Sequence, residues 1–151
     1  MFDYRPYLAI PFVPHGRDRS GCDCWGLVCL VYRDCFNVSL PPFDRAVGDV
    51  NNPLSVAPVM AAGAAQDIWV KSDTPRAGDV LLFGTRAAPY HVGLYVNGDL
   101  MLHTRAGTDA TTERWRGCLW DRRLIGFFRH RLLCDETRTA QSGAHRPAPA
   151  A

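Results

Sequence analysis

Residues 23–36, DCWGLVCLVYRDCF, decide the fold of this 151-residue chain. Apolar residues recur at positions 24, 27, 28, 31 and 35, which is the spacing of a helix that buries one face. Asp23 stands where the N-cap of such a helix belongs, and Pro41-Pro42 ends the segment. The sequence therefore predicts a helix whose first turn begins at Cys24.

Downstream of this helix the sequence predicts a second helix and then a series of strands. A second helical segment covers residues 54–70, weakened by Pro58 and Gly63. After it, buried strands are predicted at residues 79–83, 91–96, 100–104 and 124–130. Asn97-Gly98 separates two of these strands and predicts a hairpin turn, because both turn positions need a positive φ. Helices followed by antiparallel strands indicate an α+β fold, with the helices packed on one side of the sheet.

Length and composition limit the class of protein. We expect one domain over residues 1–134 and a polar tail over residues 135–151. The net charge of +2 gives no argument for a nucleic-acid partner, and 47% apolar residues exclude a disordered chain. No run approaches the ~18 apolar residues of a membrane span. The N-terminus does not resemble a signal peptide, so action outside the cytoplasm would need another carrier.

Four of the six cysteines fall within fourteen residues, which raises the possibility of a metal site. They are Cys22, Cys24, Cys29 and Cys35, and the other two are Cys118 and Cys134. Their spacing lacks the tight pairs of a structural zinc site, and four ligands on one helix cannot converge. We therefore expect reduced thiols, no metal and no cofactor, with Cys29 and Cys35 as packing residues.

Cys24 is the candidate nucleophile. The partial positive charge and free N–H groups of a helix N-terminus favour thiolate over thiol and can receive an oxyanion. His91 starts one strand of the predicted hairpin, and His103 lies nearly opposite it if the turn holds two residues. His91 can then serve as general base and His103 as the residue that orients it. The alternative is a core cysteine and two structural histidines.

Four motifs, in order along the chain, resemble the NlpC family of papain-like cell-wall peptidases. They are residues 10–28 (ending in Gly21-Cys-Asp-Cys-Trp-Gly-Leu-Val28), Ala77-Gly-Asp-Val-Leu-Leu-Phe83, His91-Val-Gly-Leu-Tyr-Val96 and Leu100-Met-Leu-His-Thr104. The resemblance implies a papain-like fold with Cys24 as nucleophile and as oxyanion donor through its backbone N–H. It also implies His91 as general base and His103 as orienting residue, without a metal. The implied reaction is hydrolysis of an amide bond in peptidoglycan stem peptides, most often between D-glutamate and diaminopimelate.

Two positions near the expected site depart from the family pattern. Phe12 replaces a tyrosine whose hydroxyl lies near the thiol, and Trp25 replaces the serine after the cysteine. The run from Cys22 to Val28 resembles a short branch of the family found in phage-tail and gene-transfer-agent genes. That branch implies assembly in the cytoplasm, tail-tip or baseplate partners, and action on the cell wall while DNA is delivered.

Other interpretations stay open at this stage. Phe12 is compatible with a tail-tip or baseplate component that kept the fold and lost the activity. An amidase or acyltransferase acting on another substrate is also open, because a fold does not decide a substrate. Arg17 and Arg19 precede the nucleophile, either as solvated charges or with one of them binding a stem-peptide carboxylate. Trp25 either forms a wall of the cleft or packs in the core.

Overall fold

The computed structural model describes residues 1–43, 45–85 and 87–134, so the predicted tail at 135–151 lies outside the described residues. Its helices include α1 (Cys24–Phe36) and α2 (Pro53–Ala64), with short 3₁₀ turns at Arg5–Tyr7 and Asp121–Arg123, and residues 131–134 are also helical. Strands β1 (Arg17–Asp18) and β2 (Gly21–Cys22) form a small ribbon before α1. The main sheet contains β3 (Trp69–Ser72), β4 (Val80–Gly84), β5 (Pro89–Asn97), β6 (Leu100–Arg105), β7 (Thr108–Arg114) and β8 (Leu124–His130).

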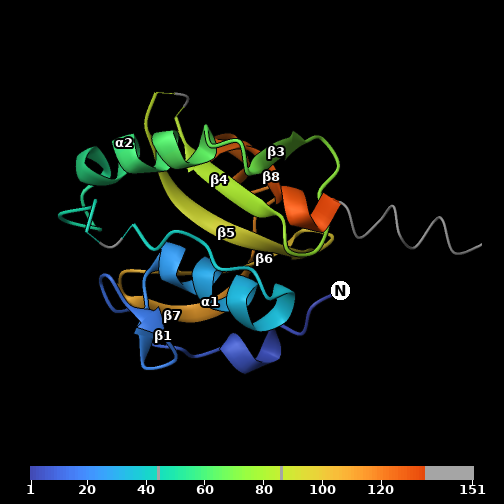
Figure 1. Ribbon diagram of the computed structural model, residues 1–151, viewed down its shortest axis with the longest axis horizontal. Coiled ribbons are helices and arrows are strands. Elements are labelled where there is room, and N and C mark those ends of the chain that lie inside the picture. The colour runs from blue at the N-terminus through green and yellow to red at the C-terminus, as the bar shows by residue number, and fades with distance from the viewer. Residues whose placement is uncertain (44, 86, 135–151) are drawn as a thin grey trace, which may run out of the picture.

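The main sheet is antiparallel throughout, with the strand order β3-β8-β4-β5-β6-β7. The sheet curls, and both helices lie on the same side of it, where α2 contacts β5 and α1 contacts β5 and β6 (Figure 1). The predicted α+β fold, with N-terminal helices packed on an antiparallel sheet, is confirmed. None of the helices in the described ranges is long and apolar enough to cross a membrane.

The buried face of α1 builds the main core. Leu27, Val28 and Val31 pack against Leu94 and Leu102 of the sheet. The opposite face of the sheet carries a smaller cluster that includes Leu81, Phe83, Met101 and Trp115. Cys35 is exposed, so the prediction that it packs in the core is wrong, because the buried face continues through Leu30 and Tyr32 instead.

Two segments differ from the sequence prediction. The second helix ends at Ala64 rather than near residue 70, and Trp69 already belongs to β3. Strand β7 was not expected, since its sequence TDATTER is polar and only Ala110 in it is buried. An edge strand of this kind buries too little apolar surface to produce a period-two pattern.

The hairpin formed by β5 and β6 is confirmed, but its register is not the expected one. Gly98 and Asp99 form the turn, and the pairing shifts between Tyr95 and Asn97. Leu94 therefore pairs with Leu102, and the same register continued sets His103 opposite Gly93. His91 lies one diagonal step away rather than opposite His103.

Gly93 lies close to side chains of β6 in this hairpin. A Cβ at this position would meet the Met101 sulfur at 3.0 Å and the Cβ of His103 at 3.4 Å. The missing side chain leaves room for His103 beside β5, which brings the two histidines into contact across the diagonal.

Candidate functional site

The Asp23 carboxylate fixes the start of α1. It is 3% exposed, and its Oδ1 accepts the backbone N–H of Gly26 at 2.8 Å, so the predicted N-cap is confirmed. The same oxygen accepts a hydrogen bond from Arg17 at 2.7 Å, while Oδ2 accepts the backbone N–H of His15 at 3.0 Å. These three bonds tie the preceding loop to the helix and hold Cys24 at its first turn.

The thiol of Cys24 lies against the peptide group that joins His91 to Val92. The backbone N–H groups of Val92 and Trp25 both act on the sulfur, and Cys24 and Val92 line the same hollow. Val92 lies beyond the residues that β5 pairs with β6, which begin at Leu94. The sulfur thus lies against the backbone of β5 at Val92, the residue that follows the candidate base His91 in the sequence.

The electrostatics of Cys24 differ from the expectation. Removal from water, followed by the Asp23 carboxylate, raises the pKa of Cys24 to about 12, although the Val92 and Trp25 N–H groups lower it. The helix N-terminus acts in the expected direction, but desolvation and a carboxylate one residue away outweigh it. The raised pKa favours a protonated Cys24 thiol in the free protein.

The two histidines form a hydrogen-bonded chain that ends on a carboxylate. His91 Nε2 lies 2.9 Å from His103 Nδ1, and His103 Nε2 lies 2.8 Å from Glu113 Oε2. Both rings are buried, at 6% and 1% exposure. The structure thus brings His91 and His103 together as the sequence indicated, and it adds Glu113 from β7.

The chain of bonds fixes the positions of the protons. A carboxylate only accepts, so His103 donates its Nε2–H to Glu113 and keeps a bare Nδ1 when neutral. That Nδ1 accepts the Nε2–H of His91, which leaves the Nδ1 of His91 without a proton. His91 is then in the tautomer that a general base requires.

Burial controls how the histidines titrate. Desolvation lowers the pKa of His91 well below its usual value, and the nearby charges of His103 and Arg105 lower it further. Desolvation also lowers the pKa of His103, while the Glu113 carboxylate opposes that shift. Both rings are consequently neutral near pH 7, which suits a base that accepts a proton only as the reaction proceeds.

Trp120 covers the pair. Its indole ring stacks on His91 at a centroid distance of 4.8 Å and an angle of 27°. Its Nε1–H donates to Glu113 Oε1 at 3.1 Å. Trp120 thus hydrogen-bonds the Glu113 carboxylate and also packs on the ring of His91.

Sequence reasoning missed both Glu113 and Trp120. Glu113 lies in the unpredicted strand β7, and Trp120 lies just before the Asp121–Arg123 turn. No spacing in the sequence links either residue to His103, because the contact depends on the β6–β7 register.

The two arginines bond acceptors of the protein itself. Arg17 donates to Asp23, to the Gly16 carbonyl and twice to the Pro42 carbonyl. Arg19 pairs with Asp34 at 2.9 Å and lies over the ring of Tyr7. These bonds give both arginines a structural role, and carboxylate binding by either stays a prediction.

Phe12 and Trp25 lie close to the nucleophile's loop. Phe12 forms a bridge with Cys22, two residues before Cys24. Trp25 lines the hollow beside Cys24 and donates its indole N–H to the Pro41 carbonyl at 2.7 Å. Within the described part of the chain, no group of three or more His, Cys, Asp or Glu side chains could hold a metal ion.

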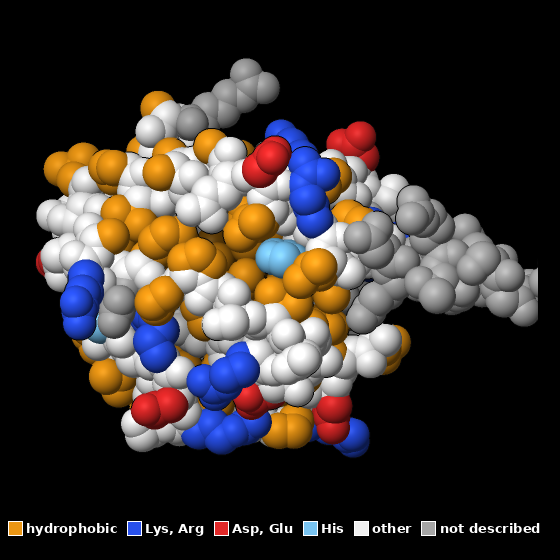
Figure 2. Space-filling view, in the orientation of Figure 1, with side chains coloured by type: hydrophobic (Ala, Val, Ile, Leu, Met, Phe, Trp, Pro, Cys, Tyr) orange, Lys and Arg blue, Asp and Glu red, His pale blue; other side chains and the backbone are white. Residues whose placement is uncertain are grey.

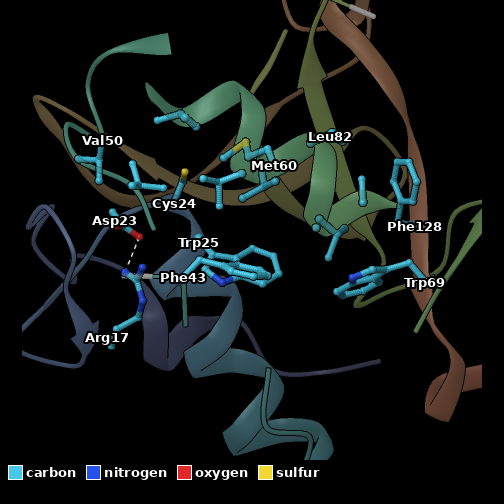
Figure 3. Close-up of a pocket in the computed structure, with 17 residues that line it drawn as sticks. Arg17, Asp23, Cys24, Trp25, Phe43, Val50, Met60, Trp69, Leu82 and Phe128 are labelled. Carbon is cyan, nitrogen blue, oxygen red and sulfur yellow. Dashed lines mark hydrogen bonds and ion pairs between the residues drawn. The ribbon is translucent and has the colours of Figure 1, made fainter. Parts of the chain in front are cut away.

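An apolar hollow extends from Cys24 between α2 and the sheet (Figure 3). Trp25 and Phe43 form its lower wall, and Trp69 and Phe128 lie at the end far from the thiol. Arg17 and Asp23 lie beside Cys24 at the near end, bonded to each other.

A sequence model of the NlpC/P60 family matches residues 9–129, a span that includes Cys24, both histidines and Glu113. The chain belongs to the NlpC/P60 family. A probable endopeptidase of Haemophilus influenzae is 31% identical over 126 residues, which are 79% of this chain and 68% of that protein. The family membership agrees with the resemblance of the four sequence motifs.

Solved NlpC/P60 structures share the fold. The NlpC/P60 domain of the peptidoglycan hydrolase SagA superposes with a TM-score of 0.59 at 19% identity, covering 83% of this chain and 91% of that domain. A Bacillus cereus family member gives a TM-score of 0.63 at 18% identity, with 83% of this chain and 37% of that chain covered. The papain-like architecture implied by the sequence is therefore confirmed.

Proposed function

We propose that this NlpC/P60 protein is a cysteine peptidase that hydrolyses an amide bond in peptidoglycan stem peptides. The observation that carries the proposal is the Cys24 thiol beside the His91–Val92 peptide, with His91 joined to His103 and Glu113. A nucleophile, a base in the correct tautomer and a group that orients the base are the parts that acyl transfer to cysteine requires.

In the proposed reaction, His91 Nδ1 takes the thiol proton of Cys24 as the sulfur attacks the amide carbonyl. The backbone N–H of Cys24, at the start of α1, stabilises the oxyanion. The amine then leaves with the proton from His91, and a thioester remains on Cys24. Water attacks this thioester and gives a proton to His91. The C–S bond then breaks, the acid is released, and His91 returns the proton to the Cys24 sulfur. Glu113, acting through His103, favours the imidazolium that forms in each half-reaction.

The high pKa of Cys24 supports a particular order of events. Because the resting pair is a thiol and a neutral imidazole, proton transfer accompanies attack instead of preceding it. A buried imidazolium beside a thiolate would cost free energy in the absence of substrate. The substrate carbonyl provides the place to which the negative charge of the sulfur moves.

Two finer points belong to the proposal. The bond cleaved is the amide between D-glutamate and diaminopimelate, and the enzyme rides on a phage tail or tail-like particle to open the wall during DNA delivery. The support for the bond is the resemblance of the four motifs to the NlpC family, and the support for the particle is the resemblance of residues 22–28 to the short phage-tail and gene-transfer-agent branch. In this setting its protein partners are tail-tip or baseplate components.

The activity is tested on defined muropeptides that differ in where the amide bonds lie, with products identified by mass spectrometry. The proposal expects wild type to split L-Ala-D-Glu-diaminopimelate after D-glutamate and Cys24→Ala to release nothing. Cleavage at another stem-peptide amide would keep the peptidase and change the bond. Products that form equally with Cys24→Ala would overturn the mechanism.

A further inference from the structure

The hollow next to Cys24 has an unusually uniform chemistry for a site beside a nucleophile. Helix α2 contributes Val56, Val59 and Met60, and the sheet contributes Val80, Leu82 and Phe128. Hydrophobic side chains also gather on the outer surface over α2 and between α2 and α1 (Figure 2). The hollow is thus apolar on its floor and on its walls, and it opens on an apolar surface.

The two charged residues that line this hollow already form an ion pair and hydrogen bonds within the protein. Arg17 and Asp23 form an ion pair at 2.7 Å, with their side chains 21% and 5% exposed. Asp23 also accepts the N–H groups of His15 and Gly26, and Arg17 also donates to Pro42. A ligand carboxylate or ammonium group in the hollow would find no free counter-charge among these lining residues. An uncompensated charge in an apolar site is strongly unfavourable.

The walls also offer a ligand little hydrogen bonding. The indole N–H of Trp25 points to the Pro41 carbonyl, so its ring presents carbon to the hollow. Its ring centroid lies 5.7 Å from that of Phe43 and 6.4 Å from that of Trp69, which gives one side an aromatic wall. Such walls favour aliphatic and aromatic groups, which gain about 25 cal/mol for each Å² of apolar surface removed from water.

We propose that the hollow is a substrate subsite that binds an uncharged aliphatic part of the substrate near the amide attacked by Cys24, such as an alanine methyl or the methylene stem of a stem-peptide residue. Cys24 and Val92 line one end of the hollow, so the hollow begins at the nucleophile. A group bound in it is therefore part of the substrate whose amide bond Cys24 attacks. The inference rests on the proposed function in taking Cys24 as the nucleophile, and it names the substrate chemistry that this site selects. The stem-peptide carboxylates lie outside the hollow when substrate is bound.

The test uses the full-length protein and two alkylating reagents of equal intrinsic reactivity. N-hexyl iodoacetamide carries an aliphatic chain, and N-(5-carboxypentyl) iodoacetamide carries the same chain ending in a carboxylate. In each case the sulfur displaces iodide, an S–C bond replaces the C–I bond, and the thiol proton passes to buffer. Mass spectrometry of peptides gives a separate rate for each cysteine.

The expected result is a preference of at least tenfold for the hexyl reagent at Cys24, against a ratio near one at the exposed Cys118. The Cys118 ratio within the same sample corrects for reagent concentration and reactivity. Equal ratios at the two cysteines in wild type would overturn the proposal, and this comparison needs no variant.

A pair of variants on α2 adds a second comparison. Val59→Glu places a carboxylate in the hollow and is expected to remove the preference at Cys24. Leu54→Glu changes a residue of the same helix that is 82% exposed and not among the lining residues, so the preference is expected to stay. A preference that survives in folded Val59→Glu would also overturn the proposal. Muropeptide cleavage tests the peptidase separately, because alkylation does not require turnover.

Discussion

Glu113 accepts the hydrogen bond from His103 that ends the row of bonded histidines, with Oε2 of the carboxylate 2.8 Å from Nε2 of the ring. His103 is buried, whereas the Glu113 side chain is 39% exposed. The carboxylate thus connects a buried base to the surface of the protein. Its charge acts on His91 only through His103, so we regard Glu113 as a positioning residue.

The first prediction concerns Glu113→Gln. The substitution removes the charge that favours an imidazolium, so kcat is expected to fall at least about tenfold. Glu113 raises the pKa of His103, and its loss lets burial lower the pKa of the histidine pair further. The acid limb of kcat/KM therefore moves to lower pH. A merely structural role would lower kcat without that shift, and Asp109→Asn on the same strand is the matched control.

The pH profile of wild type follows from the same groups. Burial lowers the pKa of His91 well below the usual 6.5, so the neutral base persists as the pH falls. Activity is lost only when the histidine pair gains a proton, and the acid limb of kcat/KM should lie below pH 6.5. A limb at or above that value would show that the histidines are not held neutral by burial.

A third prediction follows from the pKa of Cys24. Because the thiol has a pKa of about 12, its alkylation by iodoacetamide should keep rising with pH through pH 9. A preformed thiolate–imidazolium pair would instead give a rate that levels off below pH 7. Site-resolved mass spectrometry of wild type distinguishes the two profiles.

Asp23 contributes to this high pKa, which gives a fourth prediction. Asp23→Asn removes the carboxylate charge next to the sulfur while keeping a cap oxygen. The pKa of Cys24 should fall, and its alkylation at pH 8 should become faster. Asp34→Asn, near the other end of α1, should leave the rate unchanged. A slower reaction in Asp23→Asn would contradict this account of the sulfur's environment.

Arg129 provides a prediction about stability. It bonds both oxygens of Asp79 at 2.6 and 2.9 Å, and the two side chains are 12% and 1% exposed. Arg129→Met leaves a buried carboxylate without its partner, so the free energy of unfolding should fall by about 3 kcal/mol or more. Arg131→Met breaks an exposed pair with Asp67 and should cost under about 1 kcal/mol. Urea unfolding measures both, and similar losses would contradict the assigned difference.

The sequence was sufficient for the parts of the fold that carry strong local patterns. The helix after Asp23 and the strands around Asn97-Gly98 were predicted because burial and turn chemistry are local there. The register of β5 against β6 was not predicted, because the shift between Tyr95 and Asn97 depends on how the two strands pair. Strands β3 and β7 lie at the sheet edges and carry little apolar periodicity.

Some residues of the candidate site could be predicted from the sequence and others could not. Cys24, His91 and His103 stand out by residue type and by place in predicted elements. Glu113 and Trp120 do not, because their partners are set by tertiary contacts across β6 and β7. The effect of the helix N-terminus on the pKa of Cys24 can be recognised in the sequence, whereas desolvation by the surrounding residues cannot.

The most direct test of Cys24 as the nucleophile is digestion of purified peptidoglycan sacculi by wild type, Cys24→Ala and Cys35→Ser. Cys35 is an exposed cysteine at the far end of the same helix, which makes its variant the matched control. The account predicts that wild type and Cys35→Ser release the same stem-peptide fragments and that folded Cys24→Ala releases none. Release by Cys24→Ala at the wild-type rate would contradict it.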